Sequence, residues 1–326
     1  MPTSEVQAAP ATMRAIAAPT WGTADVLEPV MIARPEPGPT EILVAVHAAG
    51  INAADWKWRA SGGFGQGQWG DPPILGYDVS GVVEAVGLGA SLFKPGDEVF
   101  GMPRFPEQAG GYAEYVVAPS RRFARKPESL DHVHAAALPL VGVTAWQALA
   151  EVADVQPGQR VLVHAAAGGL GHVAVQVAKS LGAYVVVTAT APKHELLRSL
   201  GADELLDYRE IDFAETLRDL DVVLDTIGGD YGMRSLATLR RGGVLVALAG
   251  PLDPAVEARA RELGVDAGFT LVEPDRAGLL AITDLVDSGG LRIEIAYVLP
   301  LADAARAHEL GETNRTTGKL VLKIRD

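Results

Sequence analysis

The segment RVLVHAAAGGLGHVAVQVAKSLGA, residues 160–183, decides the fold of this chain. It opens on the apolar run 161–163, which predicts a fully buried strand of a parallel sheet. A turn of small residues follows over 165–171, and apolar residues at helical spacing then continue to Leu181. Gly182 is a typical helix stop. The segment therefore predicts a strand, a glycine turn and a helix in direct succession.

This succession is the context that a dinucleotide-binding fingerprint requires. Gly168 would let backbone N–H groups approach a pyrophosphate, and Gly171 would let the helix pack closely on the strand. The helix N-terminus, with its unpaired N–H groups, favours an anion. Ala166 stands where the usual motif has its first glycine. The alternative is a tight turn that binds no ligand.

The second half of the nucleotide unit favours NADPH over NADH. NAD-binding folds carry an acid about 20 residues after the glycines, where it holds the ribose 2′-hydroxyl. No Asp or Glu occurs between Gly168 and His194. Thr190 and Lys193 instead supply a hydroxyl and a cation, close to the start of the next predicted helix. A solvated surface lysine is the alternative for Lys193.

Composition narrows the class of protein. The 326 residues suffice for two domains, and a net charge of −13 argues against nucleic-acid binding. Without cysteine, disulfides, thiolate catalysis and cysteine-ligated metals are excluded. No apolar run is long enough for a membrane span, and residues 1–11, which lack the character of a secretory signal, are expected to be a loose tail. We therefore expect a cytoplasmic protein.

The strand pattern changes at about residue 138. Before it, short apolar runs separated by Gly and Pro predict a small β-barrel with strands over 13–17, 41–48, 79–87, 98–100 and 112–118. After it, strands alternate with helices, the pattern of a doubly wound sheet, with strands over 161–164, 184–189, 221–225 and 243–248. A buried helix over 138–155 connects the two parts. Its Thr144 hydroxyl either bonds back to its own helix or contacts a ligand.

Nearly all of the chain after the tail resembles the zinc-independent, zeta-crystallin-like quinone oxidoreductases of the medium-chain dehydrogenase/reductase superfamily. Besides the glycine turn, the resemblance rests on AGINAADWKWR (49–59), ILGYDVSGVVEAVG (74–87), FKPGDEVFG (93–101), GGYAEYVV (110–117), ALPLVGVTAWQAL (137–149), LGADELLDY (200–208), DVVLDTIGG (221–229) and GKLVL (318–322).

The resemblance implies a GroES-like catalytic domain over 1–133, a Rossmann NADP-binding domain over 134–273, and a return of 274–326 to the catalytic domain. It implies NADPH as cofactor, bound at Ala166, Gly168, Gly169, Leu170, Gly171, Thr190, Lys193, Tyr208, Thr226, Ile227, Ala249 and Gly250. It also implies a catalytic set near the nicotinamide, namely Asn52, Tyr77 and Thr144.

Zinc-dependent relatives ligate their catalytic metal through a Cys and a His in two of these motifs. The corresponding stretches here are Gly50-Ile51-Asn52 and Gly76-Tyr77-Asp78, so both ligands are missing and we expect no metal site. The expected activity is therefore hydride transfer from NADPH to a quinone or other conjugated carbonyl without zinc. The alternatives are an enoyl or alkenal double-bond reductase and a non-enzymatic, crystallin-like NADPH-binding protein.

Three further expectations concern the surroundings of the site. The glycine-rich loop 61–70 carries Phe64 and Trp69, which either cover a planar ligand or pack as part of a surface loop. An edge strand over 268–272 needs covering, and in relatives the equivalent edge pairs with its copy, so we expect a homodimer. Water is favoured over Tyr77 as the proton source, because an ordinary tyrosine has a pKa of about 10.

Overall fold

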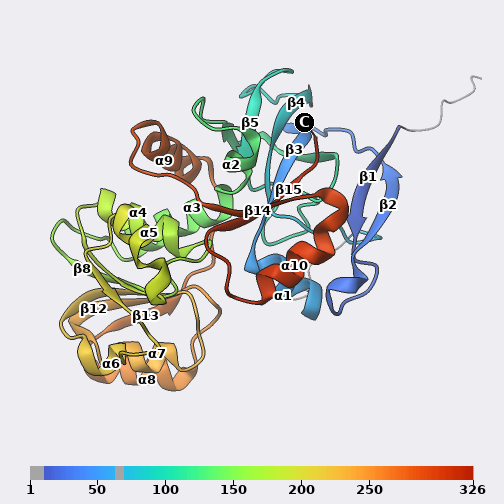
Figure 1. Ribbon diagram of the computed structural model, residues 1–326. Coiled ribbons are helices and arrows are strands. Elements are labelled where there is room, and N and C mark those ends of the chain that lie inside the picture. The colour runs from blue at the N-terminus through green and yellow to red at the C-terminus, as the bar shows by residue number, and fades with distance from the viewer. Residues whose placement is uncertain (1–10, 63–69, 326) are drawn as a thin grey trace, which may run out of the picture.

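The computed structural model describes residues 11–62 and 70–325 (Figure 1). Residues 1–10 of the predicted tail lie outside this part of the chain, as do Phe64 and Trp69 of the glycine-rich loop.

One half of the molecule is β-rich. Its main sheet runs in the order β14-β15-β3-β4-β5-β7, with β6 added to β3, and β1 and β2 form a separate antiparallel pair. The central strand β3 is mostly buried, because β15, β4 and β6 all pair with it. The strands are β1 (Thr12–Ala17), β2 (Glu28–Ala33), β3 (Glu41–Ile51), β4 (Asp78–Val86), β5 (Glu98–Gly101), β6 (Tyr115–Pro119), β7 (Phe123–Arg125), β14 (Ile295–Pro300) and β15 (Lys319–Lys323).

The other half is a six-stranded parallel sheet in the order β10-β9-β8-β11-β12-β13. Its central strands are short Val- and Leu-rich runs that are buried on both faces, as parallel strands covered by helices must be. The strands are β8 (Arg160–Val163), β9 (Tyr184–Thr188), β10 (Glu204–Leu206), β11 (Leu220–Asp225), β12 (Leu239–Ala247) and β13 (Asp266–Phe269). The predicted α/β fold class, a β-rich unit beside a doubly wound parallel sheet, is confirmed.

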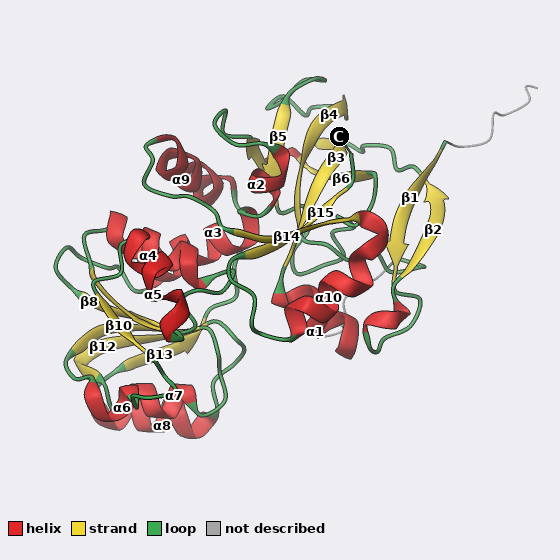
Figure 2. Cartoon of the chain, viewed as in Figure 1, coloured by secondary structure: helices red, strands yellow, loops and turns green. Residues whose placement is uncertain are grey.

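Helices cover both faces of the parallel sheet, with α4 and α5 on one side and α6, α7 and α8 on the other (Figure 2). Among the described residues, no helix combines the length and apolar character needed to cross a bilayer. The helices are α1 (Ala53–Ser61), α2 (His132–Ala136), α3 (Pro139–Trp146), α4 (Gly171–Ser180), α5 (His194–Ser199), α6 (Phe213–Thr216), α7 (Tyr231–Leu236), α8 (Pro254–Leu263), α9 (Arg276–Asp287) and α10 (Ala304–Glu312).

Helix α3 joins the two halves and is packed closely on α4 and α9. A Cβ on Gly142 would lie 3.1 Å from Ile282, and one on Gly278 would lie 3.0 Å from Val143, so glycines bring α3 and α9 together. The predicted helix over 138–155 is interrupted after Trp146. From Gln147 to Val152 the backbone widens into π-helical hydrogen bonding.

The end of the chain returns to the β-rich half. Strand β15 pairs antiparallel with β3, so that Leu320 lies opposite Ile51. The residue before β15, Gly318, donates its N–H to the carbonyl of Ala167 in the glycine turn, at 2.9 Å. Strand β15 therefore places its first residue, Lys319, between the glycine turn and the start of α1.

Candidate active site

Four predicted cofactor positions follow the carboxyl ends of four neighbouring strands. Ala166 comes after β8, Thr190 after β9, Thr226 after β11 and Ala249 after β12. Thr226 Oγ1 donates to the carbonyl of His164 at 2.8 Å, which ties the β11 end to the β8 end. In open parallel sheets, ligands bind in the crevice at this edge. The fold thus brings these four positions to one edge of the sheet.

The glycine turn between β8 and α4 has the shape that the sequence predicts. A Cβ on Gly171 would lie 2.5 Å from the Ala165 oxygen and 2.6 Å from the Ala166 Cα, so the helix start leaves room only for glycine. A Cβ on Gly168 would approach only the Ala165 oxygen, at 3.2 Å, among the described residues. Gly171 therefore serves packing within the protein, whereas Gly168 leaves space in front of the turn.

The other cofactor positions at this edge are half-buried or exposed: Gly169, Leu170, Ile227 and Gly250. The β-rich half approaches the same edge, because Lys57 Nζ on α1 donates to the carbonyl of Ala249 at 3.2 Å. The edge of the parallel sheet is thus faced by α1 across the junction of the two halves.

Lys193 lies at a small cluster of cations. Its Nζ donates to the carbonyls of Arg315 and Thr316, at 3.2 and 3.4 Å. Burial lowers the pKa of Lys193, and the nearby charge of Arg209 lowers it further. Tyr208, the neighbour of Arg209, is 47% exposed. The site that the sequence assigns to a 2′-phosphate therefore has a second cation, Arg209, close to Lys193.

One carboxylate also lies near this cluster, although the sequence has none between the glycine turn and His194. Asp207 accepts hydrogen bonds from the backbone N–H groups of Ala191 and Arg209, at 2.8 and 3.0 Å. These two bonds hold the pKa of Asp207 below its ordinary value. The negative charge of Asp207 is therefore stabilised by backbone N–H donors. Sequence spacing missed it, because Asp207 comes from the end of β10 and not from β9.

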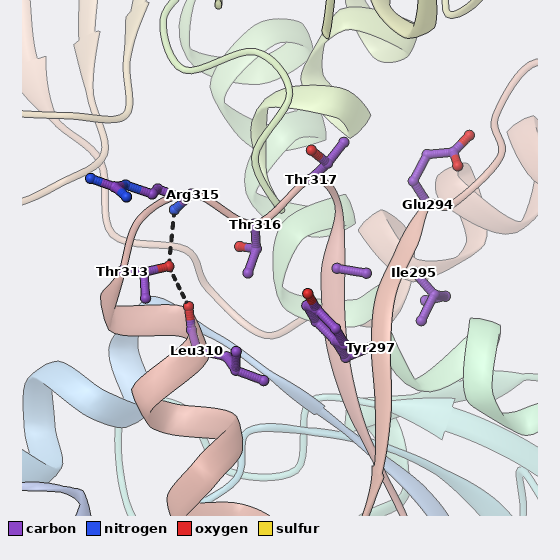
Figure 3. Close-up of a pocket in the computed structure, with 9 residues that line it drawn as sticks. Glu294, Ile295, Tyr297, Leu310, Thr313, Arg315, Thr316 and Thr317 are labelled. Atoms are coloured by element: carbon purple, nitrogen blue, oxygen red, sulfur yellow. Dashed lines mark hydrogen bonds between the residues drawn. The ribbon is translucent and has the colours of Figure 1, made fainter. Parts of the chain in front are cut away.

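A pocket of about 470 Å³ opens beside the segment that holds Lys193. It lies between β14 and the loop 313–317 (Figure 3), and Tyr297 and Thr316 are among its lining residues. The loop is braced by its own side chains, since Thr313 Oγ1 donates to the Leu310 carbonyl and accepts from the Arg315 N–H. Neither this pocket nor the position of Arg315 was predicted from the sequence.

Asn52 lies in a buried polar network that spans the junction of the two halves. Its Nδ2 donates to Asp78 Oδ2 at 2.8 Å, and its Oδ1 accepts from the ammonium of Lys319. Asp78 Oδ1 accepts the N–H of Leu140 at 2.8 Å, and the Lys319 Nζ lies 3.5 Å from Asp78 Oδ2. Burial lowers the pKa of Lys319, while the charges of Asp78 and Asp55 oppose that shift.

Asp55 fixes the backbone on either side of this network. It accepts the N–H of Asn52 at 2.7 Å and the N–H of Gly76 at 3.1 Å. Complete burial raises its pKa to about 7. Asp55 thereby ties the start of α1 to the segment that carries Tyr77.

The two other predicted catalytic residues are also buried. Tyr77 packs edge-on against Trp58 and Phe105, and its hydroxyl is buried without a hydrogen-bond partner among the described residues. Burial is the main cause that raises the pKa of Tyr77, and the charge of Asp55 adds to it. Thr144 Oγ1 donates to the Leu140 carbonyl at 2.6 Å, as in the helix-bonded alternative. The Thr144 hydroxyl can therefore only accept a hydrogen bond from a ligand.

Within residues 11–62 and 70–325, no three His, Asp or Glu side chains form a group that could hold a metal ion. The buried carboxylate of Asp78 already has a counter-ion in the Lys319 ammonium. No role for Lys319 was predicted from the sequence. The only sequence signal for it was its place in the GKLVL motif, because its partner Asn52 is 267 residues away.

The comparisons with known proteins agree with this arrangement. Residues 38–128 match the alcohol dehydrogenase GroES-like domain, and residues 200–322 match a family described as zinc-binding dehydrogenase. The chain is 32% identical to a mitochondrial NAD(P)H oxidoreductase, RTN4IP1, of Danio rerio, over 88% of this chain and 84% of the relative. It is 35% identical to a 2-haloacrylate reductase of a Burkholderia species, over 88% of this chain and 91% of that protein.

Among solved structures, the quinone oxidoreductase from Coxiella burnetii superposes with a TM-score of 0.91 at 37% identity. The match covers 97% of this chain and all of the other. The chain belongs to the medium-chain dehydrogenase/reductase superfamily, as the sequence motifs predicted, and it is an NAD(P)H-dependent oxidoreductase.

Proposed function

We propose that this member of the superfamily is an NADPH-dependent reductase that reduces a quinone or another conjugated carbonyl without zinc. One observation carries the proposal: the glycine turn and the buried Asn52–Asp78–Lys319 network meet at the same junction of the two halves. The turn offers backbone donors and a helix N-terminus for a pyrophosphate, and the network contains Asn52, which the family resemblance assigns to the nicotinamide end.

The residues present fit the phosphorylated form of the cofactor. The open space in front of Gly168 suits a pyrophosphate, and Lys193 with Arg209 supplies two cations for a 2′-phosphate. Thr190, at the end of β9, adds a hydroxyl. Asp207 is engaged by backbone N–H groups, so we expect it not to reverse this preference.

The independence from zinc is supported by the donor set. Asn52 and Tyr77 stand at the motif positions that hold metal ligands in zinc-dependent relatives, and neither an amide nor a phenol of raised pKa is a good zinc ligand. Lys319 already balances the charge of Asp78. Without a metal to polarise a simple carbonyl, we expect saturated ketones and alcohols to be poor substrates.

When bound, NADPH supplies the hydride. The chain holds the acceptor against the cofactor at the junction of the two halves, where proximity lowers the barrier. A conjugated acceptor spreads the incoming charge, so it needs less electrostatic help than an isolated carbonyl. The raised pKa of the buried Tyr77 makes this phenol a reluctant acid, which favours water as the proton source.

A steady-state panel tests the proposed function. Turnover of NADPH and of NADH is measured against quinones, enones, alkenals and saturated ketones of matched size. We expect turnover with the conjugated acceptors, a preference for NADPH, and little activity with the saturated ketones. Activity confined to saturated ketones or alcohols would contradict the proposal. Tight NADPH binding without any turnover would favour the non-enzymatic alternative.

A second candidate is reduction of an activated carbon–carbon double bond, as in an enoyl or alkenal reductase. It is favoured by the 35% identity to a 2-haloacrylate reductase over most of both chains. The same site would serve, because hydride addition to a conjugated C=C bond also disperses the incoming charge. In the panel, faster turnover of enals and enones than of quinones would select this candidate.

We also propose a homodimer and a cytoplasmic location. Strand β13 ends one side of the parallel sheet, and Leu271 beside it is 37% exposed, so a second copy could cover this edge. Light scattering at micromolar concentration tests the dimer, and a monomer would count against a dimer.

Cell fractionation tests the proposed cytoplasmic location, and recovery of the protein in an organelle would count against that location.

A further inference from the structure

Lys319 is a fully buried lysine that touches both parts of the candidate site. Its side chain is 2% exposed, and a Cβ on Gly169 would lie 3.1 Å from its Cδ, so its stem packs against the glycine turn. Its ammonium donates to Asn52 Oδ1 and lies 3.5 Å from Asp78. A buried ammonium is costly unless it is paired, so the partners of Lys319 determine whether it can stay charged there.

Burial raises the pKa of Asp78, but the charge of Lys319 and the hydrogen bonds from Asn52 and Leu140 oppose that shift and favour the ionised carboxylate. The Asp78 carboxylate accepts from the backbone N–H of Leu140 and from the amide of Asn52, and the Lys319 ammonium faces it as well. A protonated carboxyl would present a proton of its own among these donors. The buried charges of Asp78 and Lys319 are therefore paired, with the Asn52 amide between them.

This pairing determines which way the Asn52 amide points. An ammonium can only donate, so the amide oxygen must face Lys319; an ionised carboxylate can only accept, so the amide nitrogen must face Asp78. The nitrogen carries two protons. Among the described residues, one of these protons is donated to Asp78, and the second is left for another acceptor. The reverse orientation would set the oxygen against a carboxylate and the amide protons against an ammonium.

We propose that Lys319 is a positioning residue that, together with Asp78, locks the Asn52 amide so that its second N–H donates to the carbonyl oxygen of the bound acceptor. The inference rests on the proposed function. The ammonium on the amide oxygen also draws electron density from the amide and makes its N–H a stronger donor. Asn52 thus supplies, in part, the polarisation that a metal supplies in zinc-dependent relatives.

The kinetic test compares Lys319→Met, Asn52→Ala and the double variant, with Lys323→Met as a matched control on the exposed end of the same strand. Loss of a positioned donor costs about 100- to 1000-fold in kcat, and loss of its positioning less. We expect Lys319→Met to lower kcat about 10- to 100-fold with the Kd for NADPH within about threefold of the parent protein. The double variant should be no slower than Asn52→Ala alone, because Lys319 acts through Asn52.

A second comparison separates this role from a purely structural one. Lys319→Met leaves the charge of Asp78 buried and unpaired, which should lower the melting temperature. In the Lys319→Met/Asp78→Asn variant the charge is removed, so thermal stability should recover while kcat stays low. Recovery of kcat together with stability, or additive losses in the double variant with Asn52, would overturn the proposal. A weakened Kd for NADPH with kcat unchanged would assign the amide to the cofactor, and would overturn it as well.

The amide lock itself can be tested without turnover. In protein labelled with ¹⁵N at asparagine, the two side-chain protons of Asn52 should exchange slowly with solvent, and in Lys319→Met faster. If the parent protein turns over no conjugated carbonyl, the proposed function has failed, and this measurement still decides whether Lys319 holds the amide. Unchanged exchange in Lys319→Met would refute the lock.

Discussion

The replacement Lys193→Ala gives the sharpest test of cofactor choice. The ammonium of Lys193 now contacts two backbone carbonyls, at 3.2 and 3.4 Å, and a phosphate would be a stronger partner for it. A hydrogen bond to a charged group contributes about 1.5–3 kcal/mol. That range corresponds to a loss of about 10- to 100-fold in NADPH affinity. Because Arg209 remains beside the site in the variant, we expect a loss nearer the lower end.

The assay is fluorescence titration of NADPH and of NADH against the parent protein and the variant. NADH lacks the 2′-phosphate, so its Kd should change by less than about threefold. Arg198→Ala removes an exposed cation from the neighbouring helix α5 and is the matched control, with both affinities expected to stay unchanged. Equal weakening of the two cofactors would show that Lys193 acts by holding the loop at Arg315 and Thr316, and would refute a role in phosphate recognition.

Three further predictions concern the proton, the turn and the buried histidines. Tyr77→Phe should cost less than tenfold in kcat with a 1,4-quinone, because the raised pKa disfavours proton donation; a far larger loss with NADPH binding intact would make Tyr77 the donor. Gly171→Ala should lower the melting temperature of the free protein, because the new Cβ would lie 2.5 Å from a backbone oxygen. Gly168→Ala should be tolerated, because there the same distance would be 3.2 Å. Equal melting temperatures of the two variants would contradict the turn geometry. Burial lowers the pKa of His164, His172 and His308 from the ordinary value of about 6.5 to about 3, 4 and 3, respectively. Above about pH 6.5 these rings are neutral in both the folded and the unfolded chain and cost no stability. As the pH falls from 6.5 toward 3, the unfolded chain is protonated at these histidines before the folded chain is, so the free energy of unfolding falls. At pH 5 each buried histidine lowers the free energy of unfolding by about 2 kcal/mol, and the raised pKa of Asp55 offsets part of this loss. The urea midpoint of unfolding should therefore be lower at pH 5 than at pH 7. An unchanged midpoint would contradict the burial of these rings.

The parts of the fold that local sequence encodes could be predicted. The segment 160–183 forms strand β8, the glycine turn and helix α4, because burial on both faces and small residues at the turn are local properties. Strands β2 (Glu28–Ala33), β7 (Phe123–Arg125) and β10 (Glu204–Leu206) were missed. Strands β7 and β10 have only three residues each, and β2 begins at Glu28-Pro29 and is mostly exposed, so none shows a clear apolar pattern.

The candidate site likewise contains residues that could be predicted from the sequence and residues that could not. The positions at the strand ends could be predicted, because the edge of a parallel sheet collects the residues that follow each strand. The contact of Lys319 with Asn52 could not, since it depends on the pairing of β15 with β3 across 267 residues. Asp207 was missed for a similar reason, because it reaches the Lys193 region from β10.

A labelling experiment can follow the hydride in metal-free protein. The protein is treated with a chelator until zinc is undetectable, then mixed with an enone and NADPH that carries deuterium at both positions of C4, while quinone turnover is measured in parallel. The product is analysed by NMR. We predict deuterium at the carbon β to the carbonyl and rates that chelation leaves unchanged for both acceptors. Deuterium on the carbonyl carbon, or turnover that returns only when zinc is restored, would contradict a zinc-independent reductase of conjugated carbonyls.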